Sequence, residues 1–524
     1  MATDRMPGWV RGLLYTLALL VLWEGVGQLR LVAGGALPPP TAIALRLFAD
    51  WADYPNHILA TIQGASIGFV IGNAIALAAG VLFVLFPVTS RVARGLNVAI
   101  YALPPIAISP ILVLTLSGMA PRVVLAAIGC YFVTMTATVV GLSQTDARAV
   151  DVVKAYGGSK WAVLRLVQWR SALPSILSGL RIAAPNAVLG AILAEFGGGG
   201  RWGLGVYLLG SLGRGEPDRL WGIGLMATAI AAFAYLAFAV AANAITGTTQ
   251  AVTVPSSVAK AADRDRPVWQ NATIAAASVA LPFGVWMLLI WALGVPAMLA
   301  KSPAGLFEYL FLMPNSPVAQ ERLLAALAQT LPMTLIGMVA GLAMALGLAL
   351  ASQIYPAIVR AFMPIALVTQ TMPLVALTPL LVLMLGRGYS LILWVTISVT
   401  FFPAFVTMAQ GLILVPRAAL EVPRAYGAGI LTQLRLVSLP ASLPYLFAAT
   451  RLTVPRALLG VMIAEWLATG TGLGNLLNQS RGYLDYGMIW TVAVVSVLIS
   501  VAFYQIVVVV EHRVLDRLGM ASTN

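Results

Sequence analysis

The sequence is dominated by apolar runs of about 20 residues, the length that a helix needs to cross the hydrocarbon core of a membrane. We place about twelve such runs along the chain. They lie at residues 9–30, 58–86, 95–117, 122–143, 173–196, 220–246, 272–294, 325–350, 361–386, 389–413, 443–467 and 487–510. Only 9% of the 524 residues are charged, whereas a soluble chain has about 25%. The prediction is an all-α polytopic membrane protein with about 12 transmembrane helices, and not a soluble enzyme.

Few residues are available for bond chemistry. The chain has one cysteine, Cys130, and two histidines, His57 and His512, which are too few for a disulfide framework or a cysteine or histidine metal site. The net charge of +13 would suggest nucleic acid in a soluble protein, but here it reflects Lys and Arg in cytoplasmic loops. We therefore expect no catalytic residue, no bound metal and no nucleic-acid partner. A pure scaffold or channel stays open at this point.

The loops also predict the topology. Most of the 31 Lys and Arg residues fall in cytoplasmic loops when the amino terminus is placed inside the cell, and cytoplasmic loops are enriched in these residues. Both termini are therefore expected to be cytoplasmic.

The chain contains a tandem repeat. Residues 164–196 align without gaps with residues 434–466, and matched positions include Arg181 with Arg451 and Glu195 with Glu465. Each repeat has six predicted spans, so both repeats have the same orientation, which implies a pseudo-two-fold axis along the membrane normal with the pathway between the halves. We expect one repeat at 1–246, a polar cytoplasmic linker at 247–269 and a second repeat at 270–524.

One cytoplasmic loop is conserved between the repeats, at about 146–171 and about 417–440. In the second repeat Glu421 stands six residues before Gly427, and Leu439-Pro440 closes the loop. The first repeat has Asp151 and Gly157 in the matching places, but Trp169-Arg170 replaces the Leu-Pro pair. An acid in the first turn would complement the helix dipole, and a glycine permits a left-handed turn at the helix end. Such a helix, held off the membrane, could dock on a soluble subunit; the alternative is an amphipathic loop lying on anionic lipid.

These loops resemble the EAA loop of ABC importer permeases, and the resemblance covers nearly the whole chain as two copies. The taurine/sulfonate/nitrate type is the most similar. The residues that carry this likeness are Leu37-Pro38-Pro39-Pro40, Leu103-Pro104-Pro105 with Pro110, and Ala194-Glu195 with Gly203-Leu204-Gly205, repeated as Ala464-Glu465 with Gly472-Leu473-Gly474. The resemblance implies a MetI-like fold, two permease units fused in tandem and a location in the bacterial plasma (inner) membrane.

The resemblance also implies partners and coupling residues. The loop helices would be coupling helices that transmit closure of an ATPase, with Asp151, Ala155, Gly157, Glu421, Ala425, Gly427, Leu439 and Pro440 as the residues concerned. Two such loops imply two copies of a cytoplasmic ATP-binding subunit, and a periplasmic or extracellular solute-binding protein would deliver the solute. Outer loops at 197–219 and 470–486 carry charged residues that could receive the binding protein.

The chain itself has no phosphate-binding loop, because no Gly-x-x-x-x-Gly-Lys-Ser/Thr motif is present. ATP would therefore be used by the partner subunit, and this chain is expected to bind no cofactor.

Charged residues within the predicted spans are candidates for a translocation pathway or gate, because burying charge in a membrane is costly. They are Arg181, Glu195, Arg451, Arg456 and Glu465. The alternative is that they pair between helices and anchor them. Arg456 is replaced by Asn186 in the first repeat, so we hypothesise that an anionic substrate prefers one half.

The functional prediction is a permease subunit of an ABC importer for a small anionic solute. Taurine, other sulfonates, nitrate and a pyrimidine vitamin precursor all fit the resemblance. The alternative is a secondary transporter driven by an ion gradient, which would need carboxylates near the middle of the membrane; Glu24 is the one residue that we place there.

Overall fold

The computed structural model describes residues 8–198, 200–212, 214–246, 267–355 and 374–519. Within this part of the chain all regular structure is helical, which confirms the predicted all-α fold. Nine of the described helices are long and apolar enough to cross a membrane. They are α3 (Tyr54–Leu85), α7 (Ala120–Ser143), α10 (Trp169–Phe196), α12 (Pro217–Thr246), α13 (Val268–Ala292), α15 (Ser316–Ile354), α18 (Tyr389–Ile413), α22 (Leu443–Ala464) and α24 (Tyr486–Arg517).

Of the remaining three predicted spans, one differs from expectation. The run at 95–117 is not one straight span but two helices, α5 (Arg94–Ala102) and α6 (Pro105–Thr115), bent by 95°. The cause is Leu103-Pro104-Pro105: Pro104 is extended with φ −71° and ψ 116°, and a proline disfavours helix in the residue before it. The first run forms α1 (Gly8–Gln28). Of the run at 361–386, α17 (Leu374–Leu385) is described and the part before it lies outside the described residues.

Short helices connect the long ones. At the ends and in the loops lie α2 (Pro40–Ala49), α4 (Pro87–Val92), α8 (Ala147–Ala155), α9 (Lys160–Val163), α11 (Leu204–Leu212), α14 (Pro303–Phe311), α19 (Arg417–Ala425), α20 (Ile430–Gln433), α21 (Leu439–Ala441) and α23 (Gly472–Gly482). Within the described ranges, three π-helical segments adjoin the α-helices: η2 (Leu164–Gln168), η4 (Leu434–Ser438) and η5 (Glu465–Thr469). The predicted linker falls almost wholly outside the described residues, and its last two residues begin α13.

The two repeats pack in matching ways. In the first repeat α7 lies against both α3 and α10, and in the second α18 lies against both α15 and α22. Between the repeats, α5 and α6 pack on α24, while α17 packs on α12. The contact of α6 with α24 is therefore equivalent to the contact of α17 with α12. Such matched contacts are expected for two units related by a pseudo-two-fold axis.

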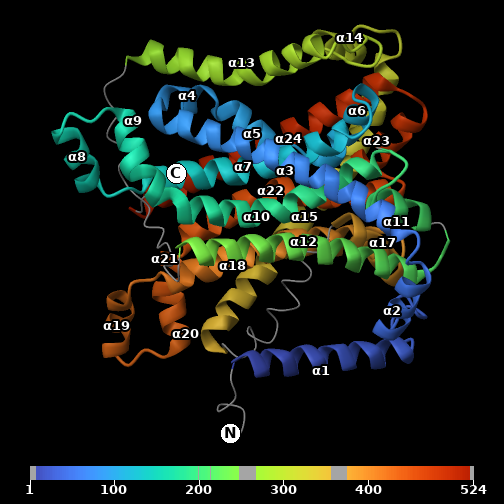
Figure 1. The fold of residues 1–524 in the computed structure, drawn as a ribbon, viewed down its shortest axis with the longest axis horizontal. Helices are drawn as coiled ribbons and strands as arrows, with labels where there is room; N and C mark the ends of the chain where they lie inside the picture. Colours follow the sequence, from blue (N-terminus) through green and yellow to red (C-terminus); the bar gives the residue numbers. More distant parts are fainter. Residues whose placement is uncertain (1–7, 199, 213, 247–266, 356–373, 520–524) are drawn as a thin grey trace.

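Helix α13, which begins the second repeat, packs on the first. It contacts α4 and α5, and the hydroxyl of Ser278 accepts a 2.8 Å hydrogen bond from the backbone N–H of Gly95. Trp286 of α13 stacks on Trp490 of α24, with ring centroids 5.6 Å apart. The rest of α13 is exposed at the edge of the bundle, as expected of a helix that faces lipid (Figure 1).

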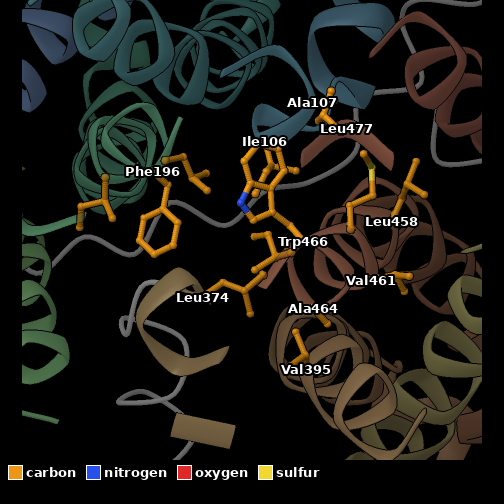
Figure 2. Packing of buried hydrophobic residues seen from close by; sticks show 14 of the residues in the cluster. Ile106, Ala107, Phe196, Leu374, Val395, Leu458, Val461, Ala464, Trp466 and Leu477 are labelled. Atoms are coloured by element: carbon orange, nitrogen blue, oxygen red, sulfur yellow. The ribbon is translucent and has the colours of Figure 1, made fainter. Parts of the chain in front are cut away.

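The largest apolar core is shared by both repeats. Figure 2 shows part of it, in which Ile106, Ala107 and Phe196 of the first repeat gather with Leu374, Trp466 and Leu477 of the second. Buried residues of both repeats belong to this one cluster, so the two repeats share an apolar core.

The bundle has two distinct ends. Helices α8 and α19, which contain the duplicated loop, lie at the same end of the molecule, whereas α2, α11, α14 and α23 lie at the opposite end (Figure 1). We call the end that contains α8 and α19 the loop end. The opposite end, with α2, α11, α14 and α23, is called the clamp end.

Candidate functional site

The two duplicated loops have the same backbone structure. Each consists of a nine-residue helix, α8 or α19, a turn at Gly157 or Gly427, a four-residue helix and a π-helical segment. The glycines have φ values of +77° and +76°. After Gly157 the N–H of Gly158 donates to Val153 O at 2.8 Å, and after Gly427 the N–H of Ala428 donates to Pro423 O at 2.9 Å. This is the Schellman closure in which a glycine takes the left-handed position, as the sequence predicted.

The predicted role of the two acids in the helix dipole is wrong. Asp151 and Glu421 are the fifth residues of α8 and α19, and no acidic residue stands in the first turn of either helix. Helix α8 begins earlier than expected because Asp146 caps it, its side chain accepting a 2.9 Å hydrogen bond from the N–H of Arg148. Both acids are exposed on the helix surface instead.

The departure at Trp169-Arg170 leaves the first loop unchanged in shape. Segments η2 and η4 occupy equivalent positions, and Leu439-Pro440 of the second repeat begins the short helix α21. Ala155 and Ala425 end α8 and α19, and the next residues, Tyr156 and Tyr426, are 91% and 89% exposed. Two equivalent helices with exposed aromatic rings therefore project from the loop end.

Glu195 is buried at the clamp end and holds three backbone or side-chain donors together. Its carboxylate accepts hydrogen bonds from the hydroxyl of Thr61 at 2.8 Å and from the N–H of Gly205 at 2.8 Å. Thr61 in turn accepts from the N–H of Leu204 at 2.9 Å. Arg122 lies 3.6 Å from the same carboxylate. Glu195 thus ties α10 to α3 and to the start of α11.

Glu465 makes the same arrangement in the second repeat. It accepts from the hydroxyl of Thr330 at 2.8 Å and from the N–H of Gly474 at 2.9 Å, while Thr330 accepts from the N–H of Leu473 at 2.8 Å. Gly472 has a φ of +79°, and a Cβ there would overlap the Glu465 carboxylate. The repeated Glu and Gly-Leu-Gly residues are therefore parts of one hydrogen-bonded clamp.

Neither glutamate is among the residues that line the cavity between the repeats. Their hydrogen bonds to Thr61 and Thr330 are of the kind expected under the alternative, pairing between helices. Arg451 also pairs with another helix: its guanidinium lies 3.3 Å from the carboxylate of Glu511 in α24. Arg181 lies over the ring of Tyr235 of α12, with its guanidinium carbon 4.2 Å from the ring centroid.

Glu24 does not lie mid-span. It is one turn from the end of α1, and its carboxylate accepts hydrogen bonds from the hydroxyl of Thr41 at 2.6 Å and from the side chain of Gln28 at 2.9 Å. It connects α1 to α2, and so offers the alternative transporter no central carboxylate.

Arg456 does line a cavity. A partly open space of about 280 Å³ lies between the repeats, with Tyr101, Phe132 and Asn186 on the first side and Ser398, Phe402 and Arg456 on the second. Pro185 and Pro455, at equivalent positions of α10 and α22, both face it. The cavity is therefore built by matched positions of the two repeats.

Several charged residues of the predicted outer loops are engaged within the protein. Arg219 donates to both oxygens of Asp50, at 2.7 and 2.9 Å, and Glu216 accepts from Arg46 at 2.7 Å. The hydrogen bonds from Arg219 hold the pKa of Asp50 below its usual range. Burial lowers the pKa of Arg481, in the other loop.

The role of Thr61, Thr330 and Arg122 could not be predicted from the sequence pattern alone. The two threonines do occupy equivalent positions of the repeat, which was the available signal, but their glutamate partners are more than a hundred residues away. Nothing in the sequence pattern linked Arg122 to Glu195.

Comparison with known proteins identifies the family. The family described as "Binding-protein-dependent transport system inner membrane component" matches the chain twice, at residues 64–250 and 337–516. A probable ABC transporter permease of Haemophilus influenzae is 29% identical over 227 residues, which are 43% of this chain and 92% of the relative.

Two further relatives carry more specific names. The formylaminopyrimidine transport permease ThiX of Halalkalibacterium halodurans is 30% identical over 201 residues, 37% of this chain and 78% of the relative. The putative aliphatic sulfonates transport permease SsuC of Bacillus subtilis is 27% identical over 195 residues, 36% of this chain and 70% of the relative.

The duplicated all-α architecture and these matches define a multi-pass membrane transport subunit that consists of two permease units in tandem. The chain belongs to the binding-protein-dependent transport system inner membrane component family, and so to the permeases of ABC transporters. Its relatives are transport subunits, and the family implies an ATP-binding subunit and a solute-binding protein as partners in general.

Proposed function

We propose that this chain supplies the whole transmembrane pathway of an ABC importer, which in the unfused arrangement takes two separate permease chains. The observation that carries the proposal is the pair of equivalent helices, α8 and α19, at one end of the molecule (Figure 1). Each presents an exposed tyrosine directly after the helix, followed by a left-handed glycine. Two equivalent projections suit two copies of one ATP-binding subunit.

We assign docking on the ATP-binding subunits to the coupling residues predicted from the sequence. Gly157 and Gly427 fix the turns, Asp151 and Glu421 are exposed acids, and Ala155 and Ala425 end the helices. Leu439-Pro440 begins the helix that leads back into α22. Because the first loop keeps the same backbone despite Trp169-Arg170, we assign coupling to both loops.

In this function the chain performs no bond chemistry and binds no cofactor. ATP is bound and hydrolysed by the partner subunits, whose closure moves α8 and α19 and, through them, the helices around the cavity. The loop end faces the cytoplasm of a bacterial cell, with both termini on that side, and a binding protein delivers the solute to the clamp end.

The solute is a small anion of the sulfonate, taurine or nitrate class, or a vitamin precursor. The relatives named for aliphatic sulfonates and for formylaminopyrimidine support this range. Arg456 in the cavity favours the anionic members.

The test is purification of the tagged full-length chain from its native membrane, with the stoichiometry of associated proteins measured by mass spectrometry. One chain with two copies of an ATP-binding subunit is the expected result. A chain that purifies alone and transports solute in liposomes with only an ion gradient would overturn the proposal and support a secondary transporter.

A further inference from the structure

The cavity between the repeats has one feature that a symmetric pore lacks, a single cationic side chain. Asn186 and Arg456 occupy the same position of their repeats, each directly after the proline of α10 or α22, and both line the cavity. Two identical permease chains would place the same residue on both walls. Here one wall offers a guanidinium and the other offers a neutral amide.

Arg456 differs from three other arginines of the long helices, Arg122, Arg181 and Arg451. Arg122 and Arg451 lie beside carboxylates, at 3.6 and 3.3 Å, and Arg181 lies over an aromatic ring. Arg456 is half-buried, and it makes no hydrogen bond or ion pair with any residue in the described ranges. No acidic residue is among the described residues that line its cavity. A partly buried cation that has no ion-pair partner among the described residues favours an anion beside it.

The rest of the lining selects the kind of anion. Tyr101, Phe132 and Phe402 contribute aromatic rings to the walls, and aliphatic side chains fill most of the remainder. The Tyr101 ring is fixed against Phe132, with centroids 4.3 Å apart, and its hydroxyl donates to Leu452 O at 3.2 Å. A rigid apolar wall opposite one guanidinium suits a molecule with one charged end and an apolar body.

The size of the cavity sets a further limit. Its volume of about 280 Å³ lies at the lower end of the range of about 300–1,000 Å³ for small-molecule sites. A planar guanidinium pairs with two oxygens of a carboxylate or sulfonate at once. A dianion such as sulfate would find one cation and mostly apolar walls.

We infer that Arg456 and Asn186 form an asymmetric solute site for a small organic monoanion, with its carboxylate or sulfonate on Arg456 and its apolar body against Tyr101, Phe132 and Phe402. The inference rests on the proposed function, since it makes this cavity the solute site of the importer. It adds the orientation of the solute, with its charge always toward the second repeat.

The test is equilibrium binding to the purified full-length chain, with benzenesulfonate as the organic monoanion and sulfate as the inorganic dianion. Wild-type protein should bind benzenesulfonate at least about tenfold more tightly than sulfate. Arg456→Asn, which places the residue of the first repeat in the second, should weaken benzenesulfonate binding about tenfold or more. Arg513→Asn, on an exposed position of α24, should leave binding unchanged.

A gain of binding provides the matched second variant. Asn186→Arg places a guanidinium on both walls and should raise affinity for benzene-1,3-disulfonate above that for benzenesulfonate, a change that a misfolded variant would not produce. Unchanged benzenesulfonate binding in Arg456→Asn, no millimolar binding of benzenesulfonate by the wild type, or no gain in Asn186→Arg would each overturn the inference. The assay needs no ATPase, so this result is independent of whether ATP-binding subunits copurify.

Discussion

The hydroxyl of Thr330 on α15 donates a 2.8 Å hydrogen bond to the carboxylate of Glu465 at the end of α22, and both residues are buried. The first repeat has the same pair in Thr61 and Glu195. In each case the threonine also accepts from the N–H of the leucine in the Gly-Leu-Gly motif. One threonine therefore links a long helix, a buried acid and the turn into α11 or α23.

This link predicts a measurable loss of stability. Thr330→Val removes the donor to Glu465 and the acceptor for Leu473, and should lower the free energy of unfolding by about 1–3 kcal/mol, the cost of leaving buried polar groups unpaired. Denaturation of the detergent-solubilised protein, followed by tryptophan fluorescence, measures it. Thr273→Val is the matched control, because Thr273 is exposed and its hydroxyl bonds only within its own helix, to Trp269 O at 2.8 Å. Equal stability of the two variants would contradict the role of the clamp.

The first clamp contains a charge that the second lacks. Arg122 lies 3.6 Å from Glu195 and also donates to Trp202 O, whereas the equivalent position in α18 is Leu391, which is fully buried. Removing one member of a buried ion pair leaves the other uncompensated, so Arg122→Leu should cost about 3–5 kcal/mol.

A second substitution should reverse part of this loss. Arg122→Leu combined with Glu195→Gln should recover part of the lost stability, because the neutral amide leaves no uncompensated charge where the guanidinium was removed. Unfolding of the single and double variants under the same denaturant series measures the coupling between the two residues. Arg387→Leu, at an exposed position just before α18, is the control and should change little. A double variant less stable than Arg122→Leu would show that the two residues do not act as a pair.

The length and number of the apolar runs were enough to predict most of the fold, because a helix that crosses a membrane has a fixed minimum length. The break at Leu103-Pro104-Pro105 was not predicted, although the prolines were visible. A proline can be accommodated within a span, as Pro185 is in α10, so its presence alone does not distinguish a kink from a 95° bend. Both α5 and α6 pack on α24 of the other repeat, and the sequence pattern does not reveal these contacts.

The site was predictable where it depends on local conformation and not where it depends on assembly. The left-handed turn at Gly427 follows from the spacing of one short segment. The position of the acids was wrong because α8 and α19 begin one turn earlier than expected. The sequence singles out Glu195 as a charged residue within a predicted span. Its partner Thr61 comes from another helix, and only packing brings the two together.

Asp50 predicts a specific response to acid. Arg219 and Arg46 donate to its carboxylate, which is 11% exposed, and these bonds lower its pKa in the folded protein. The unfolded value is about 3.9, so the stabilisation is fully present above that pH and is lost as the pH falls through the lower folded value. Wild-type protein should therefore lose more stability between about pH 6 and about pH 2 than Asp50→Asn, which lacks the carboxylate throughout. Thr273→Val changes no titratable group and should keep the wild-type profile; an Asp50→Asn profile parallel to the wild type would refute the assignment.

Two glycines of the second loop separate backbone conformation from side-chain contact. Gly427 has a φ of +76° and Gly429 a φ of −68°, and a Cβ would meet no atom within 4 Å at either position. Alanine at Gly427 must hold a left-handed conformation at a cost of about 1–2 kcal/mol, whereas alanine at Gly429 has no such cost. If α19 docks on an ATP-binding subunit, Gly427→Ala should reduce retention of that subunit about five- to thirtyfold, the factor equivalent to this energy. Gly429→Ala should retain as much of the ATP-binding subunit as the wild type does. Gly157→Ala tests the equivalent turn of the first loop. Quantitative mass spectrometry measures the amount of copurified ATP-binding subunit per chain. Equal retention by Gly427→Ala and Gly429→Ala would mean that the turn does not position the docking helix.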